Sequence, residues 1–229
     1  MKWNFLGKGC AFYPLYGNTC AYFVHNRELY MLDCGESAFE QLYKRIHLDE
    51  IERAYVIVTH LHADHVGSLG TLISYFYCVL HKPVYVIHPE TTIVDLLTLE
   101  GIDKKGYQYC MLLPDNGAGL SADPVPVTHA EDMKCYGYLL RDREECLFYS
   151  GDSSMVPEKV REMFLAGEVD RIYHDTSTHD SEHPSHCYYG KLEQIIPREK
   201  RGQFYCMHLD SPCEELLQEK GFRVVEVEK

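Results

Sequence analysis

The chain alternates short apolar runs with polar or glycine-containing turns, a pattern typical of strands and helices packed in layers. Cys20 to Val24 and Glu28 to Leu32 are two apolar-rich runs separated by a polar turn, and they predict a hairpin. Ala54 to Val58 is a fully apolar run of the kind found in buried strands. The mostly apolar segment from Val66 to Leu80 predicts a helix, and an earlier helix is expected to start at Ser37 as its N-cap.

Further along, strand-type runs follow one another with little helix between the first three, while residues 101–119 look irregular. The expected strands are Pro124–Thr128, Cys135–Leu140, Cys146–Ser150, Arg171–His174 and Phe204–Met207. Strand–strand–helix units thus occur in both halves of the chain. This repetition predicts an α/β fold with two sheets face to face and helices outside, a four-layer αββα sandwich formed by one domain over residues 1–229.

Composition narrows the class of protein. The length of 229 residues fits one large domain, and the net charge of −13 argues against an extended nucleic-acid surface, which needs a basic face. Ten cysteines without a C-x-x-C pair, and no recognisable signal peptide, predict free thiols and a cytoplasmic location. No apolar stretch is long enough for a membrane span, so we expect no membrane contact.

A dense group of metal-binding side chains follows the apolar run at Ala54 to Val58. His60, His62, Asp64 and His65 lie within six positions, and imidazole and carboxylate are the usual ligands of Zn²⁺ and similar ions. A solvated histidine-rich loop is the alternative, and the buried-type strand that leads directly into the group disfavours it.

Three later runs end in the same way. His129, Asp152 and His208 each follow an apolar run and stand at or beside a turn. Any one of them alone is more typical of a hydrogen-bonded histidine or a turn aspartate. Their common layout, together with the first group, favours a role as further ligands of a two-metal site.

The motif His60-Leu61-His62-Ala63-Asp64-His65 resembles the signature of the metallo-β-lactamase superfamily. Leu6-Gly7-Lys8-Gly9 and Leu32-Asp33-Cys34-Gly35-Glu36 resemble motifs of its tRNase Z-like branch, and the similarity extends from Phe5 to about His208. The resemblance implies the metallo-β-lactamase fold and two metal ions. It assigns the first ion to His60, His62 and His129, the second to Asp64, His65 and His208, and gives Asp152 the bridging place.

The resemblance also implies a mechanism. Two divalent cations, with Zn²⁺ expected and Mn²⁺ as the alternative, would hold a bridging hydroxide that attacks a phosphodiester. We expect Asp64 and His183 to be catalytic, with His183 as the general acid that protonates the leaving oxygen. Asp175 is expected to orient His183, and His186 is the second candidate for the acid. Asp175 and His186 are both expected beside the substrate. Asp33 is expected to support the ligands rather than to bind metal.

The expected substrate is a small anionic phosphodiester. Only Ala130 to Gly151 stands where tRNase Z carries its long tRNA-binding arm, and the chain resembles the arm-less phage anti-Pycsar phosphodiesterases, which open cyclic nucleotides. Tyrosines in glycine-containing loops are candidates for stacking on a base; they are Tyr13, Tyr16, Tyr107 and Tyr109. The resemblance favours a homodimer. The alternatives are tRNA 3′-end processing and another hydrolase of this fold, such as a lactonase, thioesterase or lactamase.

Overall fold

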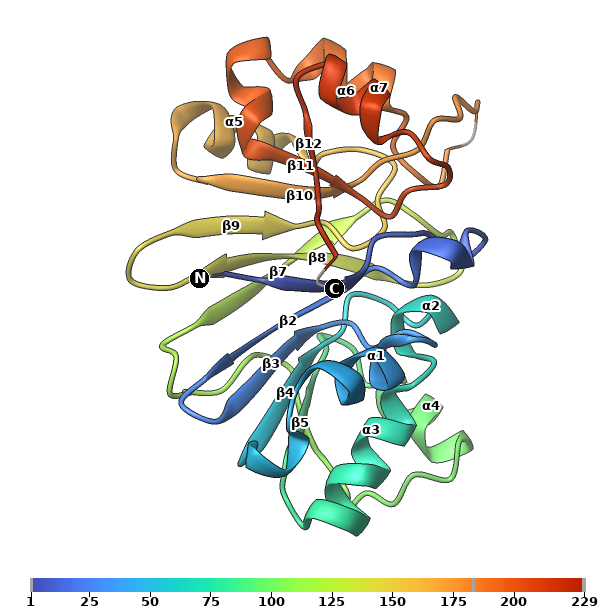
Figure 1. Ribbon diagram of the computed structural model, residues 1–229, viewed down its shortest axis with the longest axis vertical. Coiled ribbons are helices and arrows are strands. Elements are labelled where there is room, and N and C mark those ends of the chain that lie inside the picture. Colours follow the sequence, from blue (N-terminus) through green and yellow to red (C-terminus); the bar gives the residue numbers. More distant parts are fainter. Residues whose placement is uncertain (1, 183, 228–229) are drawn as a thin grey trace.

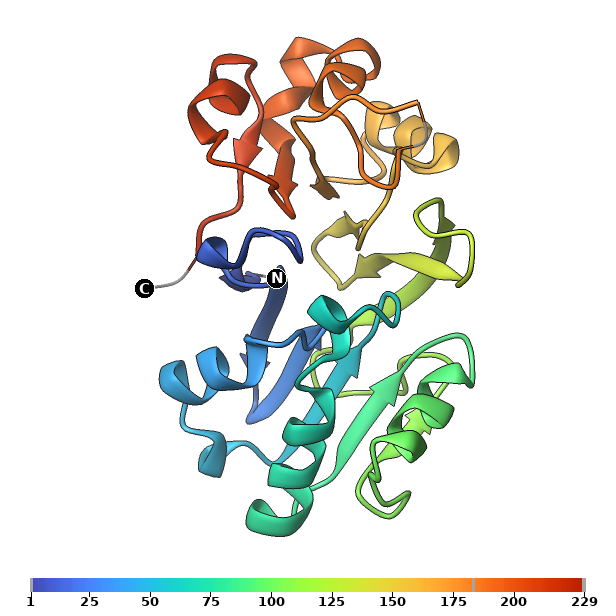
Figure 2. The ribbon, with the colours of Figure 1, turned by 90° about the vertical axis from the view of Figure 1, so that its right-hand side faces the viewer.

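The computed structural model describes residues 2–182 and 184–227. Two mixed six-stranded sheets pack face to face at the centre, and helices cover their outer faces (Figure 1). The view turned by 90° shows the helices of the two halves of the chain at opposite ends of the molecule (Figure 2). The predicted αββα sandwich is therefore confirmed.

The first sheet has the strand order β1-β2-β3-β4-β5-β6. β1, β2 and β3 pair antiparallel, whereas β3 to β6 pair parallel. Its strands are Asn4–Gly7, Cys20–His25, Glu28–Leu32, Arg53–Ile57, Val84–Ile87 and Gln108–Cys110. Its helices are α1 (Ala38–Arg45), α2 (Ala63–Val66), α3 (Leu69–Tyr75) and α4 (Thr92–Leu99).

The second sheet has the order β12-β11-β10-β9-β8-β7. β7, β8 and β9 pair antiparallel and β9 to β12 parallel, so that β7, β9, β10 and β11 end at the same edge of the sheet. The strands from β7 to β12 are Ser121–Val127, Cys135–Arg141, Cys146–Tyr149, Arg171–Asp175, Phe204–Met207 and Arg223–Val224. The helices are α5 (Glu158–Ala166), α6 (Tyr189–Ile195) and α7 (Glu214–Glu219).

The alternation of the strands explains the layers. Side chains on one face of each strand meet between the sheets, and those on the other face meet the helices. A row of stacked rings crosses four neighbouring strands in the central layer, with centroids 4.6 to 4.9 Å apart; it consists of Phe23, Tyr30, Tyr55 and Tyr85. These cross-strand pairs stabilise the first sheet behind the site.

Two expectations about local structure were wrong. The segment from Val66 to Leu80 is not one helix: α2 begins at Ala63, and α3 starts only after Ser68. The Ser68 hydroxyl donates to Gly35 O in the loop before α1 at 2.5 Å and accepts from Phe39 N in α1 at 3.0 Å. The region 101–119 contains the short edge strand β6. Ser37 does occupy the N-cap position of α1, but its hydroxyl donates to Asn18 Oδ1 instead of capping the helix.

Candidate metal centre

The histidine-rich loop is fixed by the strand that precedes it. β4 is buried, and Val58 N donates to Ile87 O of the neighbouring strand at 2.9 Å. The imidazole of His88 donates from Nδ1 to Val58 O at 3.0 Å. The loop then turns into α2, whose single turn carries Asp64 and His65 back toward His60. A rigid buried strand therefore delivers all four side chains to one place.

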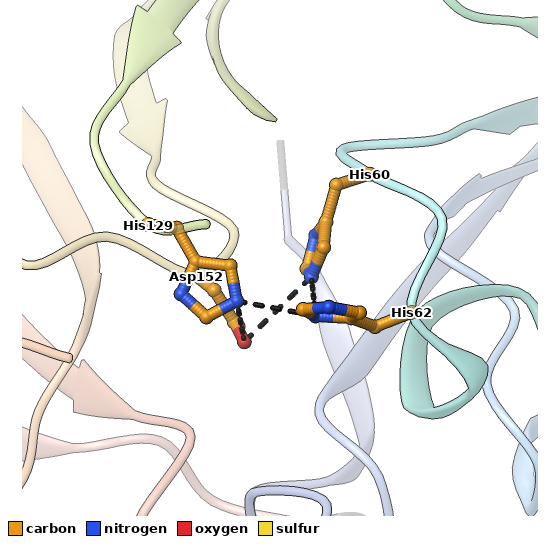
Figure 3. Close-up of side chains that lie close together, drawn as sticks. All are labelled: His60, His62, His129 and Asp152. Atoms are coloured by element: carbon orange, nitrogen blue, oxygen red, sulfur yellow. Dashed lines mark hydrogen bonds and ion pairs between the residues drawn. The ribbon is translucent and has the colours of Figure 1, made fainter. Parts of the chain in front are cut away.

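The first ligand set consists of His60, His62, His129 and Asp152 (Figure 3). His62 Nδ1 lies 3.0 Å from His60 Nε2 and 3.1 Å from His129 Nε2. Asp152 Oδ2 lies 3.8 Å from His60 Nε2 and 3.6 Å from His129 Nε2. Four ligands at Zn²⁺ bond lengths form a tetrahedron with edges of about 3.3 Å. The four atoms therefore match the spacing of a tetrahedral cation site.

The second set consists of Asp64, His65, His208 and the other carboxylate oxygen of Asp152. Asp152 Oδ1 lies 3.0 Å from His65 Nε2 and 3.2 Å from His208 Nε2. Asp64 Oδ2 lies 3.3 Å and 3.2 Å from the same two nitrogens. These four edges are also close to those of a tetrahedral site. Asp152 thus faces one set with each oxygen.

Asp152 reaches this position through a close contact between the sheets. Gly151 before it has φ of 57°, and a Cβ there would come within 2.7 Å of the Thr59 side chain. Only glycine permits this approach of the β9 end to the β4 loop without strain. Gly151 is therefore needed to place the Asp152 carboxylate.

Polar groups behind the ligands orient the rings. His65 donates from Nδ1 to Asp33 Oδ2 at 2.8 Å, and Thr59 donates its amide and its hydroxyl to the same carboxylate. His60 Nδ1 lies 3.1 Å from the Thr59 hydroxyl. A hydrogen bond at one ring nitrogen fixes the ring and directs the other nitrogen at the set. Asp33 therefore orients the His65 ring, and its expected role in supporting metal ligands stays a prediction.

The second sheet provides similar support. His129 donates from Nδ1 to Ser185 O at 2.8 Å. Asp175 at the end of β10 accepts from His186 Nδ1 at 2.7 Å and from Ser153 N at 3.0 Å. The His186 ring lies between His129 and His208, with centroid distances of 5.0 and 5.1 Å. The His186–Asp175 pair is therefore part of the same group of side chains.

The electrostatic environment differs between the two sets. Burial lowers the pKa of both His60 and His129, so these rings are neutral and offer lone pairs. Burial would also lower the pKa of His65 and His208, but Asp152 and the carboxylates behind these rings outweigh it and hold both values well above the ordinary one. A field that favours a proton on these rings also favours a cation between them.

The donor set fits bound cations. Four carboxylates are buried at or behind the site; they are Asp33, Asp64, Asp152 and Asp175. Within residues 2–182 and 184–227 their ion-pair partners are all histidines. In the same residues Asp152 Oδ1 and His65 Nε2 are buried 3.0 Å apart, but neither atom has a hydrogen bond of suitable geometry. Buried charges and unpaired polar atoms are costly unless a cation joins them.

The site lies at the floor of a cavity of about 840 Å³. Besides ligands, the lining includes His186, His179, Asp210 and the tip of the loop at Ala11 and Phe12. The sequence assigned no role to the side chain of Phe12 or Asp210, although each belongs to a stretch that resembles the family or ends a strand.

The structure brings together the predicted ligands and the Asp175–His186 pair. Their roles in binding and catalysis stay predictions, including the catalytic role of Asp64. His183 lies outside the described residues, so its expected role as the acid stays untested. The span from Ala130 to Gly151 contains only β8, β9 and their short connections, as predicted, and carries no protruding arm. No helix in the described part of the chain is long and apolar enough to cross a membrane.

Known proteins with similar sequences and structures agree with the fold. The Anti-Pycsar protein Apyc1 of Saccharibacillus brassicae is 28% identical over 191 residues, which is 76% of each protein. The metallo-β-lactamase fold protein YhfI from Bacillus subtilis superposes with a TM-score of 0.73 at 16% identity, covering 99% of this chain and 95% of YhfI. The short form of human tRNase Z gives 0.69 at 19% identity, covering 100% of this chain and 97% of the enzyme.

The structural neighbours confirm the metallo-β-lactamase fold that the motif predicted. The sequence model of the family described as Anti-Pycsar protein Apyc1 matches residues 1–227, almost the whole chain. The chain therefore belongs to the Anti-Pycsar Apyc1 family.

Proposed function

We propose that this protein is a two-metal phosphodiesterase that hydrolyses a 3′,5′-cyclic nucleotide or a similarly small phosphodiester. The observation that carries the proposal is the pair of four-atom ligand sets that share Asp152 at the floor of one cavity. The family supports the substrate, because its anti-Pycsar members degrade cyclic nucleotides.

The donor atoms favour particular ions. His60, His62, His129 and Asp152 would hold the first ion, and this nitrogen-rich set suits Zn²⁺. The second set has two carboxylates among its four ligands, so Mn²⁺ is the alternative there. Bound cations would stabilise negative charge on the phosphate oxygens and lower the pKa of an attacking water.

The residues of the chain supply the acid. We assign this role to His186, since its ring lines the cavity and its Nδ1 is held by Asp175. Burial lowers the pKa of His186, but Asp175 and Asp152 outweigh it and raise the value. The pair leaves Nε2 to give a proton to the departing ribose oxygen while Asp175 keeps the ring in place. His183, which the sequence favoured as the acid, lies outside the described residues and is tested beside His186 below.

The size of the substrate follows from what surrounds the cavity. The short β8–β9 hairpin offers no arm for holding an RNA, and the net charge of −13 disfavours a long polyanion. A cavity of about 840 Å³ accommodates a mononucleotide beside the ligand sets. These features favour a small diester over a tRNA precursor.

A substrate panel tests the proposal. Protein loaded with Zn²⁺ or Mn²⁺ is assayed with 3′,5′-cyclic nucleotides, bis-p-nitrophenyl phosphate, precursor tRNA and nitrocefin. We expect turnover of the cyclic nucleotides and the p-nitrophenyl diester. Trimming of precursor tRNA without cyclic-nucleotide turnover would instead make the protein an RNA-processing enzyme, and cleavage of nitrocefin alone would refute phosphodiester chemistry.

The expected homodimer rests on the family resemblance and stays a prediction. Light scattering coupled to size-exclusion chromatography decides it: a dimer has twice the 26.5 kDa mass of the chain.

A further inference from the structure

A turn at residues 10–13 holds an aromatic ring at the wall of the cavity. Tyr13 N donates to Cys10 O at 3.1 Å, which closes a tight turn with Ala11 and Phe12 at its tip. Both tip residues line the cavity. Phe12 is 95% exposed, the highest exposure among the large apolar side chains of residues 2–182 and 184–227. Such exposure leaves its ring free to contact a ligand.

The turn is anchored although its tip is exposed. Cys10 N donates to Leu209 O at 3.1 Å, and Leu209 N donates to Lys8 O at 2.8 Å, so the base of the turn is paired with the chain directly after His208. Lys8 also forms an ion pair with Glu214 at 2.7 Å. The position of the tip relative to the second ligand set is therefore fixed by backbone hydrogen bonds.

Phe12 is the only phenylalanine, tyrosine or tryptophan among the described residues that line this cavity. The tyrosines expected from sequence to stack on a base lie elsewhere. Tyr107 and Tyr109 pack against the core under the first sheet, and Tyr13 and Tyr16 pack against each other with their centroids 4.8 Å apart. A base that enters the cavity therefore has one hydrocarbon ring available for stacking.

We propose that Phe12 is the platform on which the nucleobase of the substrate stacks, which distinguishes nucleotides from phosphodiesters without a base. The proposal rests on the proposed phosphodiesterase function. All bases have a π face, so a platform without hydrogen-bonding groups tolerates many bases and favours purines, which have the larger face. The predicted specificity is thus for the presence and size of the base rather than for its identity.

The experiment compares Phe12→Ala, Phe12→Tyr and Leu15→Ala in the metal-loaded protein. Leu15 is a matched control because it is 83% exposed in the same loop but does not line the cavity. The substrates are 3′,5′-cyclic AMP, 3′,5′-cyclic CMP and the methyl riboside 3′,5′-cyclic phosphate, which carries methoxy in place of the base. Thermal unfolding of each variant checks that the fold is retained.

We expect Phe12→Ala to lower kcat/KM for cyclic AMP by about 5- to 30-fold, mostly through KM, since stacking on one face gives the smaller part of the usual stacking range. The effect on cyclic CMP should be smaller, and the base-free diester should be unaffected. Phe12→Tyr should restore the wild-type values, and Leu15→Ala should not differ from wild type.

Two other outcomes are distinguishable. An equal loss on the base-free diester, or no loss on cyclic AMP, would overturn the platform while leaving the phosphodiesterase intact. Failure of the wild-type protein to hydrolyse any of the three diesters would overturn the proposed function itself, and the platform with it.

Discussion

The two sheets contribute to the site in different ways. The first sheet delivers four ligand-type side chains from one loop after β4, between positions 60 and 65. The second sheet delivers His129, Asp152 and His208 from three separate loops, after β7, β9 and β11. The first contribution is local, whereas the second exists only when the strands are in the correct order. The site is therefore assembled by the packing of the two sheets.

Asp152 joins the two contributions, and its replacement gives the largest expected effect. Asp152→Ala removes an oxygen from each ligand set, so we expect less than one tightly bound metal per chain. Activity should fall on the order of 10⁴-fold, because each cation supplies several kcal/mol of charge stabilisation. Elemental analysis of the purified variant measures the metal content, and circular dichroism checks the fold. Two fully bound ions in this variant would refute the shared position.

His186 lies on the second sheet's side of the cavity and is a member of neither of the two ligand sets described above. We expect His186→Ala to keep two ions and to lose about 10²- to 10⁴-fold in kcat on a cyclic nucleotide, the usual contribution of a general acid. The loss should be much smaller on bis-p-nitrophenyl phosphate, whose leaving group needs little protonation.

His183→Ala is the matched comparison for this prediction. If His183→Ala shows the selective loss and His186→Ala does not, the acid is His183. Loss of metal from His186→Ala would mean that this ring binds an ion, in the third possible group that it forms with Asp152, Asp175 and His208.

The two ligand sets also differ in the hydrogen bonds that hold their rings, and replacement of Asp33 tests this difference. Its carboxylate holds His65 of the second set directly, but it reaches the first set only through Thr59. Asp33→Asn should lower the affinity for the second ion by about 10- to 100-fold, as is usual for residues that hydrogen-bond to metal ligands. The affinity for the first ion should fall less. Competition with a chelator measures the two affinities.

Glu28→Gln is the control for this variant, because Glu28 is a buried carboxylate of the same sheet that accepts bonds from Tyr30 and Gly117 away from the site. If Asp33→Asn lowered the affinities for both ions equally, the carboxylate would act on the whole loop rather than on His65.

The difference between the sheets also explains what could be predicted from sequence. The loop from His60 to His65 is dense in ligands and follows an apolar strand, so it was recognisable alone. His129, Asp152 and His208 were recognisable only through their shared layout and the family resemblance. A candidate for the general acid is harder to choose from the sequence, since the segment after β10 contains several histidines without a periodic pattern. The stretch from Gly7 to Phe12 resembles the family, but the place of the Phe12 side chain could not be predicted, because it depends on the pairing of residues 8–10 with Leu209.

His88 gives the smallest predicted effect, on stability rather than activity. It follows β5, is 1% exposed, and donates to Val58 O beside the ligand loop of the first sheet. Burial lowers its pKa, so the ring stays neutral in the fold while the unfolded chain takes up a proton below a pH of about 6.5. The contribution is complete above that pH and is lost as the pH falls, with a slope of at most about 1.4 kcal/mol per pH unit.

His88→Asn keeps a donor near Val58 O without a titrating ring. We therefore expect its unfolding free energy in urea to fall less steeply between pH 7 and pH 5 than that of the wild-type protein. His81→Asn is the control for the change from histidine to asparagine, because this ring is exposed in the fold and bonds with Tyr77 O instead of the ligand loop. A His88→Asn slope equal to that of the wild type would mean that His88 takes up its proton without unfolding. The neutral ring would then not be what holds the end of β4, and the rigidity of the first sheet's loop would have to come from its strand pairing alone.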